Sequence, residues 1–344
     1  MKEIGKREGT ARMPRRTTPS AGRDYTDEEI RSFVGDLESL PGGNLTVSLL
    51  MGCGPRAIAP LREFLLHGRP RGIFQPRQRA VEALAQLGAK DVLMDYLSQE
   101  RAIPDAVVRF GEEAVENTAA RELSRWLTED VYTFALHLAG HRMLAGLIDT
   151  LGEFGRPETA PVLVRALEDD VCRPAAKSAL RHIASQVKPV LVAAAQRGPA
   201  TEYERPAQLC RRRRVLRILT DLTLCAEEWE ALRPLLRDED IEIAISAAQL
   251  AMQAAPHAEK REAAVLLIRS LGHAPWFQQI QIHECLDRHY ALVRDLIVKE
   301  IEKRQQNSRR EQATDHVLRI LLAVRLAHET LGKADAGRNV GSGH

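Results

Sequence analysis

Hydrophobic residues recur along most of the chain at steps of three and four, the spacing that places them on one face of an α-helix. The pattern is clearest at 142–154 and 158–169, two helical stripes separated by Gly155 and Pro157. Glycine adopts the left-handed conformation that ends many helices, and proline is tolerated in a first helical turn. The pattern therefore predicts two helices joined by a tight turn, and a similar pair follows at 171–196.

Pairs of the same kind are predicted along almost the whole chain, and their second helices end roughly thirty to forty residues apart. The other predicted pairs are 45–51 with 56–66, 76–87 with 90–97, 104–110 with 111–127, 203–222 with 226–236, 241–254 with 258–271, and 276–289 with 292–305. A first helix at 26–40 begins with a capping box, Thr26 with Glu29, and a last helix spans 312–331. A pair that buries one face of each helix must stack on further pairs, so the pattern predicts an all-α solenoid over 25–332.

Two longer segments interrupt this period, at 128–141 and 197–206. Each lies between a second helix and the next first helix, so both are expected on the same edge of a solenoid. Tyrosine and arginine often anchor protein interfaces, and both segments contain such residues. The candidate partner-binding residues there are Tyr132, His137, Tyr203 and Arg205. The alternative interpretation is that 128–141 forms an extra packed helix.

The repeated motif resembles a known family. The segment APVLVRALEDD at 160–170, followed by RPAAKSAL at 173–180, resembles the HEAT repeat, especially its bacterial form, as do the helix ends ALAQLG and TLGEFG. The resemblance covers roughly residues 45–305, judged by the repeat period. In that family the inner helices line a concave face, and most members are scaffolds or adaptors. The resemblance therefore implies a non-enzymatic scaffold that binds a protein partner along its concave face and the inserted edge.

Charge is unevenly distributed along the chain. Residues 1–24 carry seven basic and three acidic residues without periodicity, so they are predicted to be a disordered basic arm. Residues 333–344 are predicted to be a disordered, glycine-rich tail. The net charge is +2 for the whole chain, which leaves the body at 25–332 negative. A dedicated nucleic-acid binder normally has a clear positive excess in its folded body, so a protein partner is favoured.

Four successive arginines at 211–214 form the strongest local charge. Successive residues span a full helical turn, so these side chains cannot share one face: Arg211 and Arg214 lie on one side and Arg212 on another. They could bind phosphate or an acidic protein loop, or they could cover apolar surface and pair with nearby glutamates. Arg211, Arg212 and Arg214 are therefore further candidate binding residues. The alternative function is that of a nucleic-acid-associated or DNA-modifying protein that uses this cluster.

The sequence assigns no catalytic residue, metal or cofactor. It contains no Ser-His-Asp order, P-loop or glycine-rich phosphate motif. His283-Glu284 and His328-Glu329 are similar to the iron-binding pairs of the HEAT-repeat deoxyhypusine hydroxylases, which use four such pairs. With two pairs here, a metal-dependent hydroxylase is a third hypothesis.

The cysteines and the hydropathy of the chain indicate the cellular compartment in which the protein is expected. The five cysteines have no C-x-x-C spacing, which suits small core residues in a reducing compartment. No apolar run approaches the ~18–20 residues needed to span a bilayer. The chain is therefore predicted to be cytoplasmic and to have no membrane contact.

Overall fold

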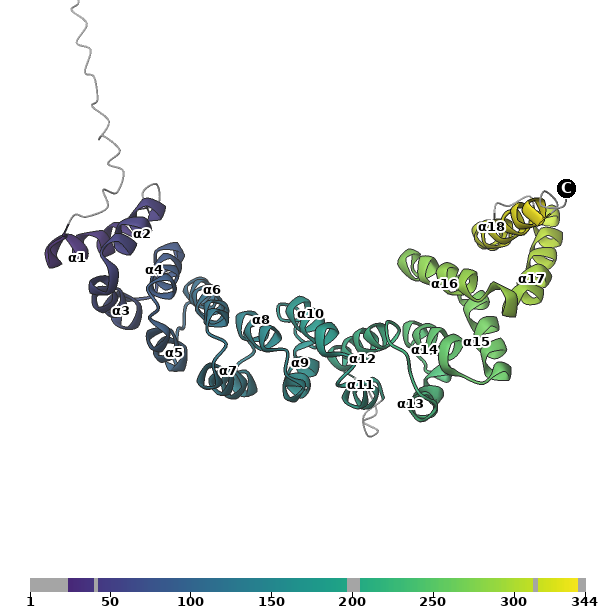
Figure 1. Cartoon of the computed structure of the whole chain (residues 1–344), viewed down its shortest axis with the longest axis horizontal. Coiled ribbons are helices and arrows are strands. Elements are labelled where there is room, and N and C mark those ends of the chain that lie inside the picture. Colours follow the sequence, from purple (N-terminus) through teal and green to yellow (C-terminus); the bar gives the residue numbers. More distant parts are fainter. Residues whose placement is uncertain (1–23, 40–42, 197–204, 312–314, 340–344) are drawn as a thin grey trace, which may run out of the picture. The chain divides into compact units, whose positions relative to one another are not determined.

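The computed structural model describes residues 24–39, 43–196, 205–311 and 315–339, and within these ranges the regular elements are all helices (Figure 1). The α-helices are α1 Asp27–Asp36, α2 Gly43–Gly52, α3 Ile58–His67, α4 Gln75–Gln86, α5 Lys90–Ser98, α6 Ala106–Glu122, α7 Glu129–His141, α8 Ala145–Phe154, α9 Ala160–Ala166, α10 Arg173–Ile183, α11 Lys188–Ala195, α12 Pro206–Leu219, α13 Ala226–Leu232, α14 Ile241–Ala254, α15 His257–Ser270, α16 Trp276–Arg288, α17 Tyr290–Glu311 and α18 His316–Asn339. Short 3-10 segments occur at η1 Gly54–Ala57, η2 Leu123–Arg125, η3 Pro157–Thr159 and η4 Arg233–Arg237. The predicted all-α class is confirmed.

Local sequence signals set several helix ends. The Thr26 hydroxyl accepts a hydrogen bond from the Glu29 backbone N–H (3.2 Å), and the Glu29 carboxylate accepts one from the Thr26 N–H (2.9 Å). This confirms the predicted capping box at the start of α1. Gly88 (φ 79°) and Gly155 (φ 61°) follow α4 and α8 with positive φ, which confirms the helix end predicted at Gly155. Both glycines allow the chain to turn directly into the next helix.

The chain divides into two compact units, Met1–Leu138 and Ala139–His344. In the first unit, alternate helices lie side by side: α2 contacts α4, α4 contacts α6, and α3 contacts α5 (Figure 1). Each of these helices buries the apolar stripe that its sequence predicts. Leu61, Leu84, Leu93 and Val115 are fully buried as a result.

A buried polar cluster also holds the first unit together. Glu112 of α6 accepts hydrogen bonds from the Arg77 guanidinium and the Tyr96 hydroxyl, each at 2.8 Å, and forms an ion pair with Arg101. Arg77 donates to the Leu65 carbonyl as well (2.8 Å), at the end of α3. Burial, followed by the negative charge of Glu112, raises the pKa of the Tyr96 phenol above its ordinary range. The cluster therefore connects α3, α4, α5 and α6 through charge-assisted hydrogen bonds.

The second unit repeats the alternate packing over a longer stretch. Its first row runs α8, α10, α12, α14, α16 and α18, each helix contacting the next. In the second row, α9 contacts α11 and α11 contacts α13, and further along α15 contacts α17. One continuous apolar cluster, from Ile148 to Val324, fills the space between these helices. The architecture within this unit is repeat-like and all-α.

The predicted third pair is wrong in one respect: 104–110 and 111–127 are not two helices. A single helix, α6, continues through Gly111. A Cβ atom at this glycine would lie 3.3 Å from the Phe74 side chain, so glycine lets the helix pack closely on the loop before α4. Close approach, and not a turn, is the reason for glycine at this position.

The second helix of that pair is supplied by the segment that was predicted to be an insertion. Residues 129–141 form α7, which buries Val131, Tyr132, Ala135 and Ala139 at helical spacing. Lys90 of α5 forms an ion pair with Asp130 at the start of α7. The structure therefore agrees with the alternative interpretation, in which this segment is a packed helix.

Two other boundaries differ from the predicted ones. α12 begins at Pro206, and residues 197–204 of the second predicted insertion lie outside the described residues. α18 continues to Asn339, so the predicted tail at 333–344 begins inside a helix. The predicted arm at 1–24 lies outside the described residues except for its last position, Asp24.

Candidate functional site

The predicted arginine cluster does not form one surface, because its members point in different directions around α12. Arg212 is 1% exposed. Its guanidinium donates to the Ala195 carbonyl (2.9 Å) and forms an ion pair with Asp238. The assignment of Arg212 to a partner-binding surface is therefore corrected, since this side chain joins α12 to the ends of α11 and η4.

The other arginines of α12 are half-buried, and most of them form ion pairs within the chain. Arg211 pairs with Glu168, and Arg213 pairs with Asp240 and with Glu242 (2.9 Å). Of the four successive arginines, Arg214 has no ion pair with another described residue. Internal pairing thus accounts for most of the charge that the sequence concentrates here.

The predicted edge residues differ in how far the structure exposes them. Tyr132 is 7% exposed within the packed face of α7, so its assignment to a partner surface is corrected as well. His137 is exposed on the opposite side of the same helix. Arg205 is exposed at the start of α12, where its backbone N–H donates to Gln208 (3.3 Å). Tyr203 lies outside the described residues.

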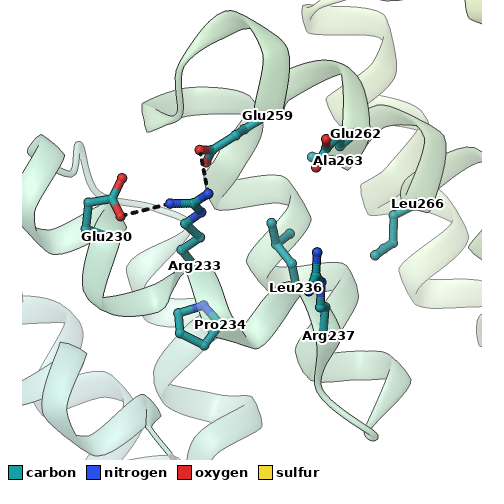
Figure 2. Close-up of a pocket in the computed structure, with 9 residues that line it drawn as sticks. All are labelled: Glu230, Arg233, Pro234, Leu236, Arg237, Glu259, Glu262, Ala263 and Leu266. Carbon is teal, nitrogen blue, oxygen red and sulfur yellow. Dashed lines mark hydrogen bonds and ion pairs between the residues drawn. The ribbon is translucent and has the colours of Figure 1, made fainter.

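A groove that the sequence did not predict lies between η4 and α15 in the second unit (Figure 2). Its first part is a cavity of about 550 Å³ with an apolar floor and a charged rim. The lining residues are Glu230, Arg233, Pro234, Leu236, Arg237, Glu259, Glu262, Ala263 and Leu266. A neighbouring cavity of about 510 Å³ shares Glu262 and Leu266 and adds Ile241 and Val265 to the apolar surface. The two cavities follow the same face of α15.

Pro234 lies where the regular helix α13 gives way to η4, the segment that lines one side of the groove. The sequence predicted one helix over 226–236, but α13 ends at Leu232 and the chain continues as the 3-10 segment η4. Proline has no N–H to donate to the carbonyl four residues earlier, so the regular hydrogen-bond pattern is interrupted there. Because Pro234 lies inside the helix predicted over 226–236, the sequence did contain a signal that the regular helix ends before this residue.

Ion pairs hold the rim of the groove in place. The Arg233 guanidinium lies between Glu230 (3.3 Å) and Glu259 (3.4 Å), as the dashed lines in Figure 2 show. Glu259 also accepts a hydrogen bond from the buried Trp229 indole (3.0 Å), which connects α13 to α15. By contrast, no ion pair joins Arg237 or Glu262 to another described residue. These two charges of opposite sign are available to a ligand in the groove.

The first unit has a separate exposed apolar patch. Ile73, Val107 and Phe110 are 57%, 68% and 69% exposed. A Cβ built at Gly72 would lie 3.4 Å from Val107, so the loop before α4 and the first turn of α6 form one surface. A cavity of about 500 Å³ adjoins it, lined in part by Phe64 and Ile73. Contiguous exposed apolar surface of this kind is typical of interaction sites.

The second His-Glu pair, His328-Glu329, has other partners in the structure. His328 contacts the Asp287 carboxylate (2.9 Å) and stacks on Tyr290 (4.3 Å between ring centroids). Glu329 accepts from Arg325 (2.7 Å). Across the described ranges, no group of three or more histidine, cysteine, aspartate or glutamate side chains is arranged to hold a metal ion.

Comparison with known proteins adds no assignment. No family model matches the chain, and no curated protein matches it. In the part of the chain that the structure describes, no helix has both the length and the apolar character required to cross a membrane.

Proposed function

We propose that the chain is a HEAT-like α-solenoid scaffold or adaptor, without enzymatic activity, that binds a protein partner. The alternate packing of helices within each unit supports the solenoid, because most helices contact those two positions away. One observation carries the binding function: the apolar-floored groove between η4 and α15.

The groove has the chemistry of a peptide-binding site. Leu236 and Leu266 are half-buried on its floor, where apolar side chains at successive turns of a partner helix could insert. Arg237 and Glu262 lie on its rim and would pair with charges of opposite sign on the partner. Such an apolar centre with a polar rim is the usual anatomy of a protein interface. In this proposal the pairing of charges sets the orientation of the bound segment.

The nucleic-acid alternative has less support. Arg211, Arg212 and Arg213 each have a carboxylate partner within the chain, which reduces the positive charge they offer to phosphates. A cytoplasmic location belongs to the same proposal as the protein partner, since all five cysteines are free thiols.

A photo-crosslinking residue at Leu266, introduced in the native host, tests the proposal. The same residue at Val171, which is 70% exposed between α9 and α10, is the control for nonspecific capture. We expect a discrete protein adduct at Leu266 that is absent at Val171. The captured protein is then purified and its affinity for the chain is measured directly.

Substitution distinguishes specific binding from mere proximity. Leu266→Glu should weaken binding of the purified partner by about tenfold or more, because it places a charge on the apolar floor, while Val171→Glu should not. Both variants should keep the circular dichroism spectrum of the unaltered chain. The groove is not the binding site if adducts at the two positions are the same or if Leu266→Glu binds normally.

A further inference from the structure

Two ion pairs fix the register between α10 and α12. Glu168, in the turn that leads from α9 into α10, pairs with Arg211 near the start of α12, and Arg181 near the end of α10 pairs with Asp221 just after α12 (3.2 Å). The two helices therefore run in the same direction. Lys177 and Arg217 lie one helical turn before Arg181 and Asp221, so this register brings their charges near each other.

The register places several cations together. Lys177 lies among Arg181, Arg214 and Arg217, and its pKa is lowered by burial and then by repulsion from these arginines, while Asp221 acts in the opposite direction. The pKa of Arg217 is lowered too, by burial and then by Arg214. The folded chain thus holds like charges close together at a free-energy cost.

The carboxylates nearby do not neutralise the whole group. Asp221 pairs with Arg181, and Glu242 is shared between Arg213 and Arg217 (2.9 and 3.4 Å). Neither Lys177 nor Arg214 forms an ion pair with another described residue. The Nε of Arg214 is buried and has no acceptor among the described residues, so an anion would be held by the terminal nitrogens of this guanidinium and by the Lys177 ammonium.

We propose that Lys177, Arg214 and Arg217 form a binding site for a phosphoryl group on a phosphorylated side chain of a protein partner. That the phosphoryl group belongs to a protein, and not to another molecule, rests on the proposed function of the chain as a protein-binding scaffold. The site itself lies on α10 and α12, apart from the groove between η4 and α15.

The charge and shape of the site favour a phosphomonoester. Such a group carries a charge of about −1.5 to −2 and three acceptor oxygens, which matches one ammonium and two guanidinium groups. The guanidinium of Arg217 lies 4.7 Å from the Phe277 ring centroid, a contact that restricts its orientation. Arginine held in this way can donate two parallel hydrogen bonds to a phosphate.

A nucleic-acid backbone fits less well. It carries one charge per phosphate and requires a continuous line of cations along its path. Here Asp221 and Glu242 border the cationic group, so the positive surface is confined to one place. A single dianionic group is the ligand that this arrangement can bind without meeting the carboxylates.

The test measures binding of phenyl phosphate to the full chain by calorimetry and by NMR of isotopically labelled lysines. Phenyl phosphate should bind and should raise the pKa of the Lys177 amine, since a bound anion stabilises the ammonium form. Lys177→Met and Arg214→Met should each weaken binding by about tenfold or more. Arg294→Met, which removes an exposed charge from α17, is the matched control and should bind normally.

Three outcomes would overturn the proposal. One is no binding of phenyl phosphate, and another is equal weakening by Arg294→Met, which would indicate only a net-charge effect. The third is tighter binding of single-stranded oligothymidylate than of a phosphoserine peptide, with the same dependence on Lys177, which would indicate nucleic acid. None of these measurements depends on Leu266. A failure of the proposed phosphoryl site can therefore be distinguished from a failure of the groove as the partner-binding site.

Discussion

Arg212 and Arg214 are two positions apart on α12, yet their surroundings are opposite. The Arg212 guanidinium is buried and bound to Asp238 and a carbonyl, whereas Arg214 is partly exposed and has no ion pair with another described residue. Two residues correspond to about 200° around a helix, which is enough to move a side chain from the core to the surface. The same residue type therefore has a structural role at one position and is available to a ligand at the other.

Substituting each arginine by alanine should separate these roles. Arg212→Ala leaves the Asp238 carboxylate without its buried partner and should lower the free energy of unfolding by roughly 3 kcal/mol or more. Arg214→Ala should not lower it, because this substitution breaks no ion pair between described residues and relieves repulsion from Lys177 and Arg217. Urea unfolding followed by circular dichroism gives both values. Equal effects of the two substitutions would contradict the burial of Arg212.

At the scale of single elements, α7 is the helix that differs most from the prediction, because its segment was predicted to be an insertion and forms a packed helix. Its buried residues follow the spacing of a packed helix, although its segment interrupts the repeat period. Replacing Ala135, which is fully buried, by aspartate should destabilise the chain by roughly 2 kcal/mol or more. Thr133→Asp, on the exposed side of the same helix, should have little effect. If both variants melt like the unaltered chain, α7 is not part of the packed core.

Helix ends permit a second comparison, between two glycines in open surroundings. Neither Gly88 nor Gly35 has an atom within 4 Å of a built Cβ, but Gly88 has φ 79° and Gly35 lies within α1. Gly88→Ala should therefore cost about 1 kcal/mol of backbone strain. Gly35→Ala should stabilise the chain by up to about 1 kcal/mol, because alanine has the higher helix propensity. Thermal melts that shift in the same direction would refute this explanation.

At the scale of the whole molecule, the second unit extends by contacts between neighbouring helices. In such an arrangement a local defect should weaken adjacent helices more than distant ones. Leu163 is fully buried in α9, and Leu163→Ala should cost roughly 2–5 kcal/mol. Hydrogen exchange should then increase in α8–α11 while α16–α18 keep their protection. Val171→Ala, at an exposed position, serves as the control.

The opposite result is also informative. A uniform rise in exchange from α8 to α18 would mean that the second unit unfolds as one cooperative block. The stability of each helix would then not depend mainly on contacts with its neighbours. Part of the support for the solenoid would be lost.

What the sequence determined by itself depends on interactions within a few residues. The spacing of apolar residues specifies a helix and the face it buries, and Thr26, Gly88 and Gly155 act through hydrogen bonds and dihedral angles of their own turns. For this reason the all-α class, most helix positions and these helix ends could be predicted from single segments.

Tertiary structure decided the features that depend on partners distant in the sequence. The burial of Arg212 requires Asp238, and the glycine at 111 is explained by Phe74, which lies on another element. The groove beside α15 depends on how η4 packs after Pro234, and the cationic group around Lys177 depends on the register of α10 with α12. No local pattern encodes these arrangements, because their free energy comes from contacts that form only when separate helices meet.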